Sequence, residues 1–178
     1  MIGIGRPAPA SDEPQVLLRE CHERIRFFTG LARRLADTED RPESQVADAA
    51  GRVRRYFSEA LPLHRDDEDE SLAPRLRGRD PIVDAALVAM TAEHGEMHGD
   101  LTALVGIAEE LARAPGRLTE LRVELHRVMD RLEPAWERHL AGEEQVVFPA
   151  MESLLAPDER ACVRAEMRAR RGIVPVPP

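Results

Sequence analysis

Apolar residues recur at alternating steps of three and four along most of this 178-residue chain, with charged residues between them. This spacing places the apolar side chains on one face of an α-helix. It predicts four long amphipathic helices, at about residues 14–37, 42–72, 80–114 and 118–155. Proline, glycine and short polar runs separate the four segments.

Three prolines fall within two of these helical patterns. Pro62 lies in the second segment, where the apolar stripe continues in phase, so we expect a bend there rather than a break. Pro134 and Pro149 lie in the fourth segment, which they are expected to kink at most. Asp80 followed by Pro81 has the residue types of an N-cap and a first helical position, and therefore predicts the start of the third helix.

Four amphipathic helices joined by short loops fold most simply as an all-α, up-down-up-down four-helix bundle. A weaker apolar pattern at about 158–170 predicts a short C-terminal helix. We therefore expect residues 14–155 to form the bundle, residues 1–13 a flexible N-terminal arm, and residues 156–178 the short helix with a flexible tail.

Composition narrows the class of protein. Aromatic residues make up 3% of the chain, which argues against a β-sandwich. The net charge of −8 disfavours nucleic acid or an anionic membrane as the main partner. The two cysteines form neither a disulfide framework nor a zinc-binding spacing. No signal peptide and no run of about 18 apolar residues is found, so we expect a cytoplasmic protein without a membrane-spanning segment.

Seven side chains that commonly bind metals lie on the predicted inner faces of the helices. Six of them form pairs spaced four residues apart, which places the members of a pair about 40° apart around a helix axis. The seven are His22, His64, Glu68, His94, His98, His139 and Glu143. The other acidic residues near Glu68, from Asp66 to Glu70, are interpreted as a solvated face.

Each of the seven has a simpler explanation when taken alone. A single histidine on an apolar stripe is more often a core residue bonded to a backbone carbonyl, and a single glutamate usually reaches water. Taken together without a metal, they would bury polar groups that cost about 1–3 kcal/mol each when unsatisfied. We therefore interpret the set as a metal site.

The types of donor indicate the metal. Five imidazoles and two carboxylates exceed what one zinc ion uses, and thiolates are absent from the set. Calcium and magnesium prefer oxygen donors, whereas a mixed set suits iron or manganese. On two six-coordinate irons, these seven donors and one bridging oxygen would leave a single position open if both carboxylates bridge. A diatomic molecule or peroxide could bind there.

The ordered set resembles the hemerythrin-like, or HHE cation-binding, family over roughly residues 14–155. The matching residues are His22, His64-x3-Glu68, His94-x3-His98 and His139-x3-Glu143 followed by Val-Val-Phe-Pro. The resemblance implies two iron ions (Fe2+/Fe3+) with a bridging oxygen ligand. It implies that the last three histidines hold one iron, the first two hold the other, and the two glutamates bridge them. The open position would then be on the iron with two histidines.

One position departs from the pattern of that family. Oxygen-carrying hemerythrins have an aspartate five residues after the last histidine, whereas here Glu143 and Glu144 both follow His139. On a regular helix Glu143 lies about 40° from His139 and Glu144 about 140° away, so we expect Glu143 to be the bridge. A π-bulge near Gly142 would turn Glu144 inward instead.

Three functions fit such a site. The first is a non-haem di-iron protein that binds dioxygen, nitric oxide or peroxide for storage, sensing or delivery. The second is a di-iron enzyme that disproportionates peroxide or oxidises ferrous iron, although histidine-rich ligation argues mildly against ferroxidase chemistry. The third is a regulatory helical module with a structural metal. Binding is favoured over catalysis. Trp136, one turn from His139, is expected to be a packing residue that can also line the ligand cavity.

Overall fold

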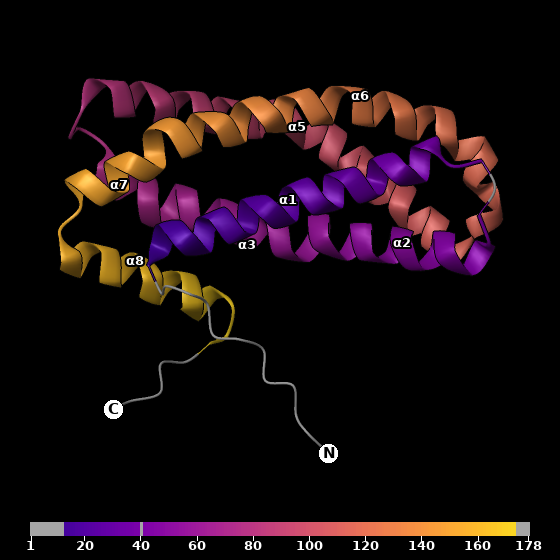
Figure 1. Cartoon of the computed structure of the whole chain (residues 1–178), viewed down its shortest axis with the longest axis horizontal. Helices are drawn as coiled ribbons and strands as arrows, with labels where there is room; N and C mark the ends of the chain where they lie inside the picture. Colours follow the sequence, from indigo (N-terminus) through magenta and orange to yellow (C-terminus); the bar gives the residue numbers. More distant parts are fainter. Residues whose placement is uncertain (1–12, 40, 174–178) are drawn as a thin grey trace, which may run out of the picture.

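The computed structural model describes residues 13–39 and 41–173, and every regular element within these ranges is helical (Figure 1). The predicted all-α class is therefore confirmed. Most of the predicted N-terminal arm and the last five residues of the predicted tail lie outside the described residues. In the described part of the chain, no helix is both long enough and apolar enough to cross a membrane.

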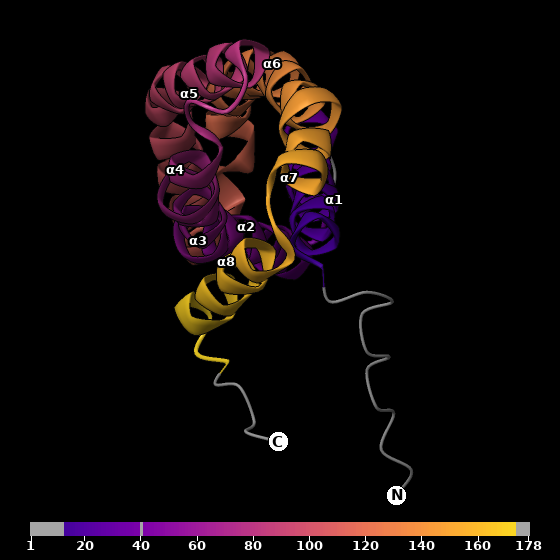
Figure 2. The ribbon, with the colours of Figure 1, turned by 90° about the vertical axis from the view of Figure 1, so that its left-hand side faces the viewer.

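Four helical rods form the bundle, and rods that are consecutive in sequence lie side by side (Figures 1 and 2). The first rod is α1 (Pro14–Asp37). The second consists of α2 (Glu43–Arg55), η1 (Tyr56–Ala60), α3 (Leu61–Asp66), η2 (Asp67–Leu72) and α4 (Ala73–Leu76). The third is α5 (Pro81–Arg113), which is followed by the short 3-10 turn η3 (Pro115–Arg117). The fourth consists of α6 (Leu118–Gly142), η4 (Glu143–Val147) and α7 (Phe148–Leu154). A shorter helix, α8 (Pro157–Arg170), completes the fold.

The second rod continues past Pro62 without a break, as the in-phase apolar stripe predicts, and extends to Leu76. It contains two π-helical segments, η1 and η2, and the fourth rod contains a third, η4. Each of these segments ends two residues before a proline, at Pro62, Pro74 and Pro149. Proline lacks an N–H and its ring clashes with the carbonyl four residues earlier. A wider turn relieves that clash and lets the rod continue.

Two apolar clusters fill the bundle. The larger joins α1, α2, α5 and α6, with Ile25, Leu104 and Leu132 among its buried members. The smaller lies at the end formed by α4, α7 and α8, and includes Leu18 and Phe148. Because α1 contributes Leu18 to one cluster and Ile25 to the other, the buried residues between them, Cys21 and His22, lie where the two clusters meet.

Helix α8 packs on the side of the bundle against η2 and α1, near the end that contains α4 and α7 (Figures 1 and 2). Its apolar anchors are Val163 and Met167, which are 0% and 2% exposed. Arg75 in α4 forms a two-point contact with Glu166 in α8, at 2.7 and 3.0 Å. The predicted C-terminal helix is thus packed on the bundle.

We expect apolar contacts to hold α8 more strongly than its ion pairs do. Met167→Ala would leave a cavity in the core and should cost about 2–5 kcal/mol in the free energy of unfolding. Arg75→Ala should cost about 1 kcal/mol or less, because the side chains of Arg75 and Glu166 are 25% and 40% exposed to solvent. Urea unfolding followed by circular dichroism compares the two variants. A larger loss for Arg75→Ala would contradict this account.

Candidate metal centre

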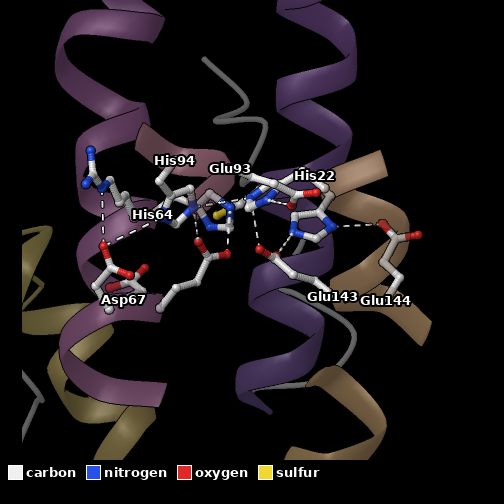
Figure 3. Close-up of polar contacts among 12 residues, drawn as sticks. His22, His64, Asp67, Glu93, His94, Glu143 and Glu144 are labelled. Atoms are coloured by element: carbon white, nitrogen blue, oxygen red, sulfur yellow. Dashed lines mark hydrogen bonds and ion pairs between the residues drawn. The ribbon is translucent and has the colours of Figure 1, made fainter. Parts of the chain in front are cut away.

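The structure brings six of the seven predicted side chains into one buried polar layer inside the bundle (Figure 3). All four rods contribute to it. The six are His22 from α1, His64 from α3, Glu68 from η2, His94 from α5, His139 from α6 and Glu143 from η4. None of them is more than 6% exposed. The helical stripes therefore predicted correctly that these six residues face inward.

The six side chains form two groups that share both glutamates. We call His22, His64 and the two glutamates the first group, and His94, His139 and the same two glutamates the second group. Within each group, one ligand atom per residue lies within 4.8 Å of all the others. Two groups that share residues are compatible with a dinuclear metal site.

Each shared carboxylate directs one oxygen towards each group. Glu143 Oε2 lies 3.0 Å from His22 Nε2 in the first group, and its Oε1 lies 2.9 Å from His139 Nε2 in the second. Glu68 Oε1 lies 2.9 Å from His64 Nε2 in the first group, and its Oε2 lies 3.4 Å from His94 Nε2 in the second. A carboxylate that bridges two metal ions presents its oxygens in this way.

Several buried polar atoms in the layer lack a well-aligned hydrogen bond to the described residues. They include both oxygens of Glu68, Oε1 of Glu143 and Nε2 of His64. The 2.9 Å approach of His64 to Glu68 is short enough for an ion pair, but it lies off the direction that a hydrogen bond requires. Such atoms cost about 1–3 kcal/mol each when buried. A cation between them would satisfy them, so the donor set fits a pair of metal ions.

The carboxylates also change the proton affinity of the imidazoles. Burial lowers the pKa of His139, but the close approach and negative charge of the Glu143 carboxylate outweigh burial and raise that pKa to about 9. Burial likewise opposes protonation of His64, yet the charge of Glu68 holds the pKa of His64 well above its usual value. Protons can therefore balance the carboxylate charge when no metal is bound, and a metal must displace them.

Glu143 and Glu144 lie on opposite sides of the His22 ring (Figure 3). Glu143 is 2% exposed and belongs to both groups, whereas the side chain of Glu144 is 23% exposed and contacts His22 Nδ1. A π-helical segment does follow Gly142, but it begins at Glu143 itself. The helix from His139 to Gly142 is therefore regular, and the expected 40° relation holds for the first of the two glutamates.

His98 is the exception among the seven, because the structure leaves it exposed and outside both groups. The buried residues nearest to it on α5 are Met90, His94, Met97 and Leu104. Their mean direction lies about 40–50° to one side of His94, whereas His98 lies about 40° to the other side. Spacing alone paired His98 with His94, but the full stripe places Met97 inward instead.

Asp67 was interpreted as part of a solvated acidic face, and this interpretation is wrong. Its side chain is 0% exposed and contacts Arg170 Nη1 at 3.0 Å and Arg171 Nη2 at 2.6 Å. Arg170 is the last residue of α8 and Arg171 directly follows it, more than 100 residues away in the sequence. No local pattern in the acidic run distinguishes Asp67 from its neighbours, so the sequence carried no signal for this contact.

A small cavity of about 40 Å³ adjoins the polar layer. His64 and His94, one from each group, line it together with Trp136. Its remaining lining residues are Leu61, Arg65, Met97, His98 and Leu101. Trp136 is both packed and part of the cavity wall, as its position one turn from His139 suggested.

Comparison with known proteins agrees with this geometry. The family model described as the hemerythrin HHE cation binding domain matches residues 14–121 and 96–172. A protein of Haemophilus influenzae, named only as an uncharacterized protein, is 27% identical over 168 residues. That alignment covers 91% of this chain and 92% of the relative. The two family matches together span all four rods and α8.

Exchanging the two neighbouring glutamates should separate their roles. Glu143→Gln removes a carboxylate that both groups share, so the variant should bind fewer than two metal ions at saturation. Glu144→Gln should still bind two, because Glu144 belongs to neither group. Metal analysis of the two purified proteins measures the difference. Full occupancy in Glu143→Gln together with loss in Glu144→Gln would show that Glu144 is the bridge.

His98 provides a matched test against His94 on the same helix. Because His98 lies outside both groups, His98→Ala should keep the full number of bound metal ions. His94→Ala removes a donor from the second group and should lower that number. If His98→Ala also loses metal, then α5 must rotate when metal binds to bring His98 into the site.

Proposed function

The chain belongs to the hemerythrin HHE cation-binding domain family, and from that premise we propose that it is a di-iron protein. It would bind dioxygen, or a related small ligand such as nitric oxide or peroxide, for storage, sensing or delivery. The observation that carries the proposal is the pair of buried carboxylates, each with one oxygen towards each histidine group.

Iron is favoured over other metals by the donor types. Both groups consist of imidazoles and carboxylates, without a thiolate, which is the mixed nitrogen and oxygen set that suits iron. Because each group holds two histidines, the two metal ions would have the same number of imidazole ligands, and not three on one and two on the other. When bound, the iron pair would supply reversible electron transfer to a small ligand.

The cavity supports a small ligand rather than an organic substrate. Its volume of about 40 Å³ exceeds the roughly 10–15 Å³ that one water requires, but it is far below the size of ordinary substrate pockets. Leu61, Met97 and Leu101 give part of its wall an apolar character. His64 and His94 place this space directly beside both candidate metal positions. A purely structural metal site would not need such a space.

A di-iron enzyme that turns over peroxide or oxidises ferrous iron is the second candidate. It gains support because His98 lies outside the groups, which makes the site richer in carboxylate than the sequence suggested. Carboxylate-rich sites better stabilise ferric iron. Turnover of hydrogen peroxide or of excess ferrous iron by the loaded protein, with loss in His64→Ala, would favour this candidate.

Reversible ligand binding has a direct optical test. Protein loaded with ferrous iron without air, and then exposed to air, should develop a visible absorption band. The band should disappear when dioxygen is removed, because the ligand leaves without being consumed. Two bound irons with an unchanged spectrum in air would contradict the proposal.

Cavity variants extend this test to the ligand's location. Leu101→Phe should narrow the space beside His64 and His94 and weaken the band. Val105→Phe is the matched control, since Val105 lies one turn further along α5, is also partly buried, and does not line the cavity.

A further inference from the structure

The four histidines of the polar layer differ in the partner of Nδ1, the ring nitrogen that faces away from the shared glutamates. His22 Nδ1 lies 2.8 Å from Glu144 Oε1, and His139 Nδ1 lies 3.0 Å from Glu93 Oε2. Neither Glu144 nor Glu93 belongs to a metal group. A carboxylate outside the metal groups therefore fixes each of these two imidazoles through its Nδ1 atom, and Figure 3 shows this for His22 and Glu144.

The other two histidines lack such a hydrogen bond. His94 Nδ1 is 3.6 Å from Asp69 Oδ2, without the alignment of a hydrogen bond. His64 Nδ1 also has no hydrogen-bonded carboxylate within the described residues; its ring contacts Cys21. Each metal group thus contains one anchored histidine and one that is not anchored.

The division follows the two shared glutamates. The anchored pair, His22 and His139, both contact Glu143, while the unanchored pair, His64 and His94, both contact Glu68. The cavity is lined by the unanchored pair and by neither anchored histidine. The polar layer therefore has two sides. On the fixed side, Glu143 contacts the two anchored histidines; on the adaptable side, Glu68 contacts the two unanchored histidines that line the cavity.

We propose that Glu144 and Glu93 are positioning residues that fix the Glu143 side of the metal centre, and that the small ligand binds on the Glu68 side. A carboxylate that accepts the Nδ1 hydrogen leaves the Nε2 lone pair directed at the metal and makes the imidazole a stronger donor. The Glu68 side keeps the freedom to adjust when a ligand enters. This inference rests on the proposed function.

The position of Glu144 is itself fixed by an arginine. Arg26 Nη2 donates to Glu144 Oε1 at 2.9 Å, and Arg26 Nη1 donates to Glu23 at 3.1 Å. Glu23 is 76% exposed, and its link to Glu144 is that both accept a hydrogen bond from Arg26. Glu23 therefore provides a control of the same residue type, on the same arginine, that does not contact the histidine.

The experiment measures ferrous iron affinity without air, by competition with a coloured chelator, in the full-length protein. Glu144→Ala and Glu93→Ala should each lower the affinity about 10–100-fold. Glu23→Ala is the control for Glu144→Ala, and Glu96→Ala is the control for Glu93→Ala, because Glu96 is an exposed glutamate of α5 that belongs to neither metal group. Both controls should leave the affinity unchanged. Asp69→Ala should have a smaller effect than Glu93→Ala, because its contact with His94 is longer.

A spectroscopic measurement separates positioning from general structural damage. In zinc-loaded, ¹⁵N-labelled protein, the Nδ1 signals of His22 and His139 should shift in the corresponding Ala variant, while those of His64 and His94 stay in place. Shifts in all four histidines would indicate a disrupted fold and overturn the positioning role. Equal iron affinity in the variants and controls would also overturn it.

The two proposals fail in different ways. If the unaltered protein binds no iron, the proposed function is wrong and the inference fails with it. If the unaltered protein binds two irons and Glu144→Ala and Glu93→Ala bind them as tightly, only the inference is wrong. For the ligand's side, Leu101→Phe should weaken the band formed in air. A band as strong as in the unaltered protein would place the ligand elsewhere.

Discussion

Two carboxylates buried among four imidazoles govern the rest of this structure. Burying Glu68 and Glu143 without partners would cost more than a small domain can offset, so the four rods must bring positive charge to them. The protons of His64 and His139, whose pKa values are raised, supply it in the metal-free protein, and metal ions would supply it in the loaded protein. The two apolar clusters on either side exclude water and strengthen these interactions.

The rods that carry the shared glutamates have the same local design. In each, a histidine lies two or three residues before the end of a regular α-helical stretch, and a glutamate four residues later lies in a π-helical segment. A proline stands ten residues after the histidine. His64, Glu68 and Pro74 form one instance, and the other is His139, Glu143 and Pro149. The π segment allows the rod to pass the proline and still pack on its neighbours. The repeated spacing is visible in the sequence, although its meaning emerges only from the structure.

The sequence predicted the bundle, its helix order and most inward-facing residues because helical periodicity is a local property. The same reasoning predicted that the second rod continues through Pro62 and that Trp136 lines the cavity. The prediction that His98 faces inward is wrong, because a spacing of four residues tells which side chains are neighbours, not which of them faces the core. Asp67 and Glu93 could not be assigned, since their partners Arg171 and His139 lie far away in the chain and no pattern relates them.

The burial of Asp67 links the end of the chain to the polar layer. Asp67 directly precedes Glu68, and its two arginines belong to the last turn of α8 and the residue after it. Burial raises the pKa of Asp67, although both arginines act to lower it, so the ion pairs are needed to keep a charge there. The packing of Met167 brings those arginines into place. The backbone position of Glu68, on the adaptable side of the centre, therefore depends on a helix that contributes no ligand.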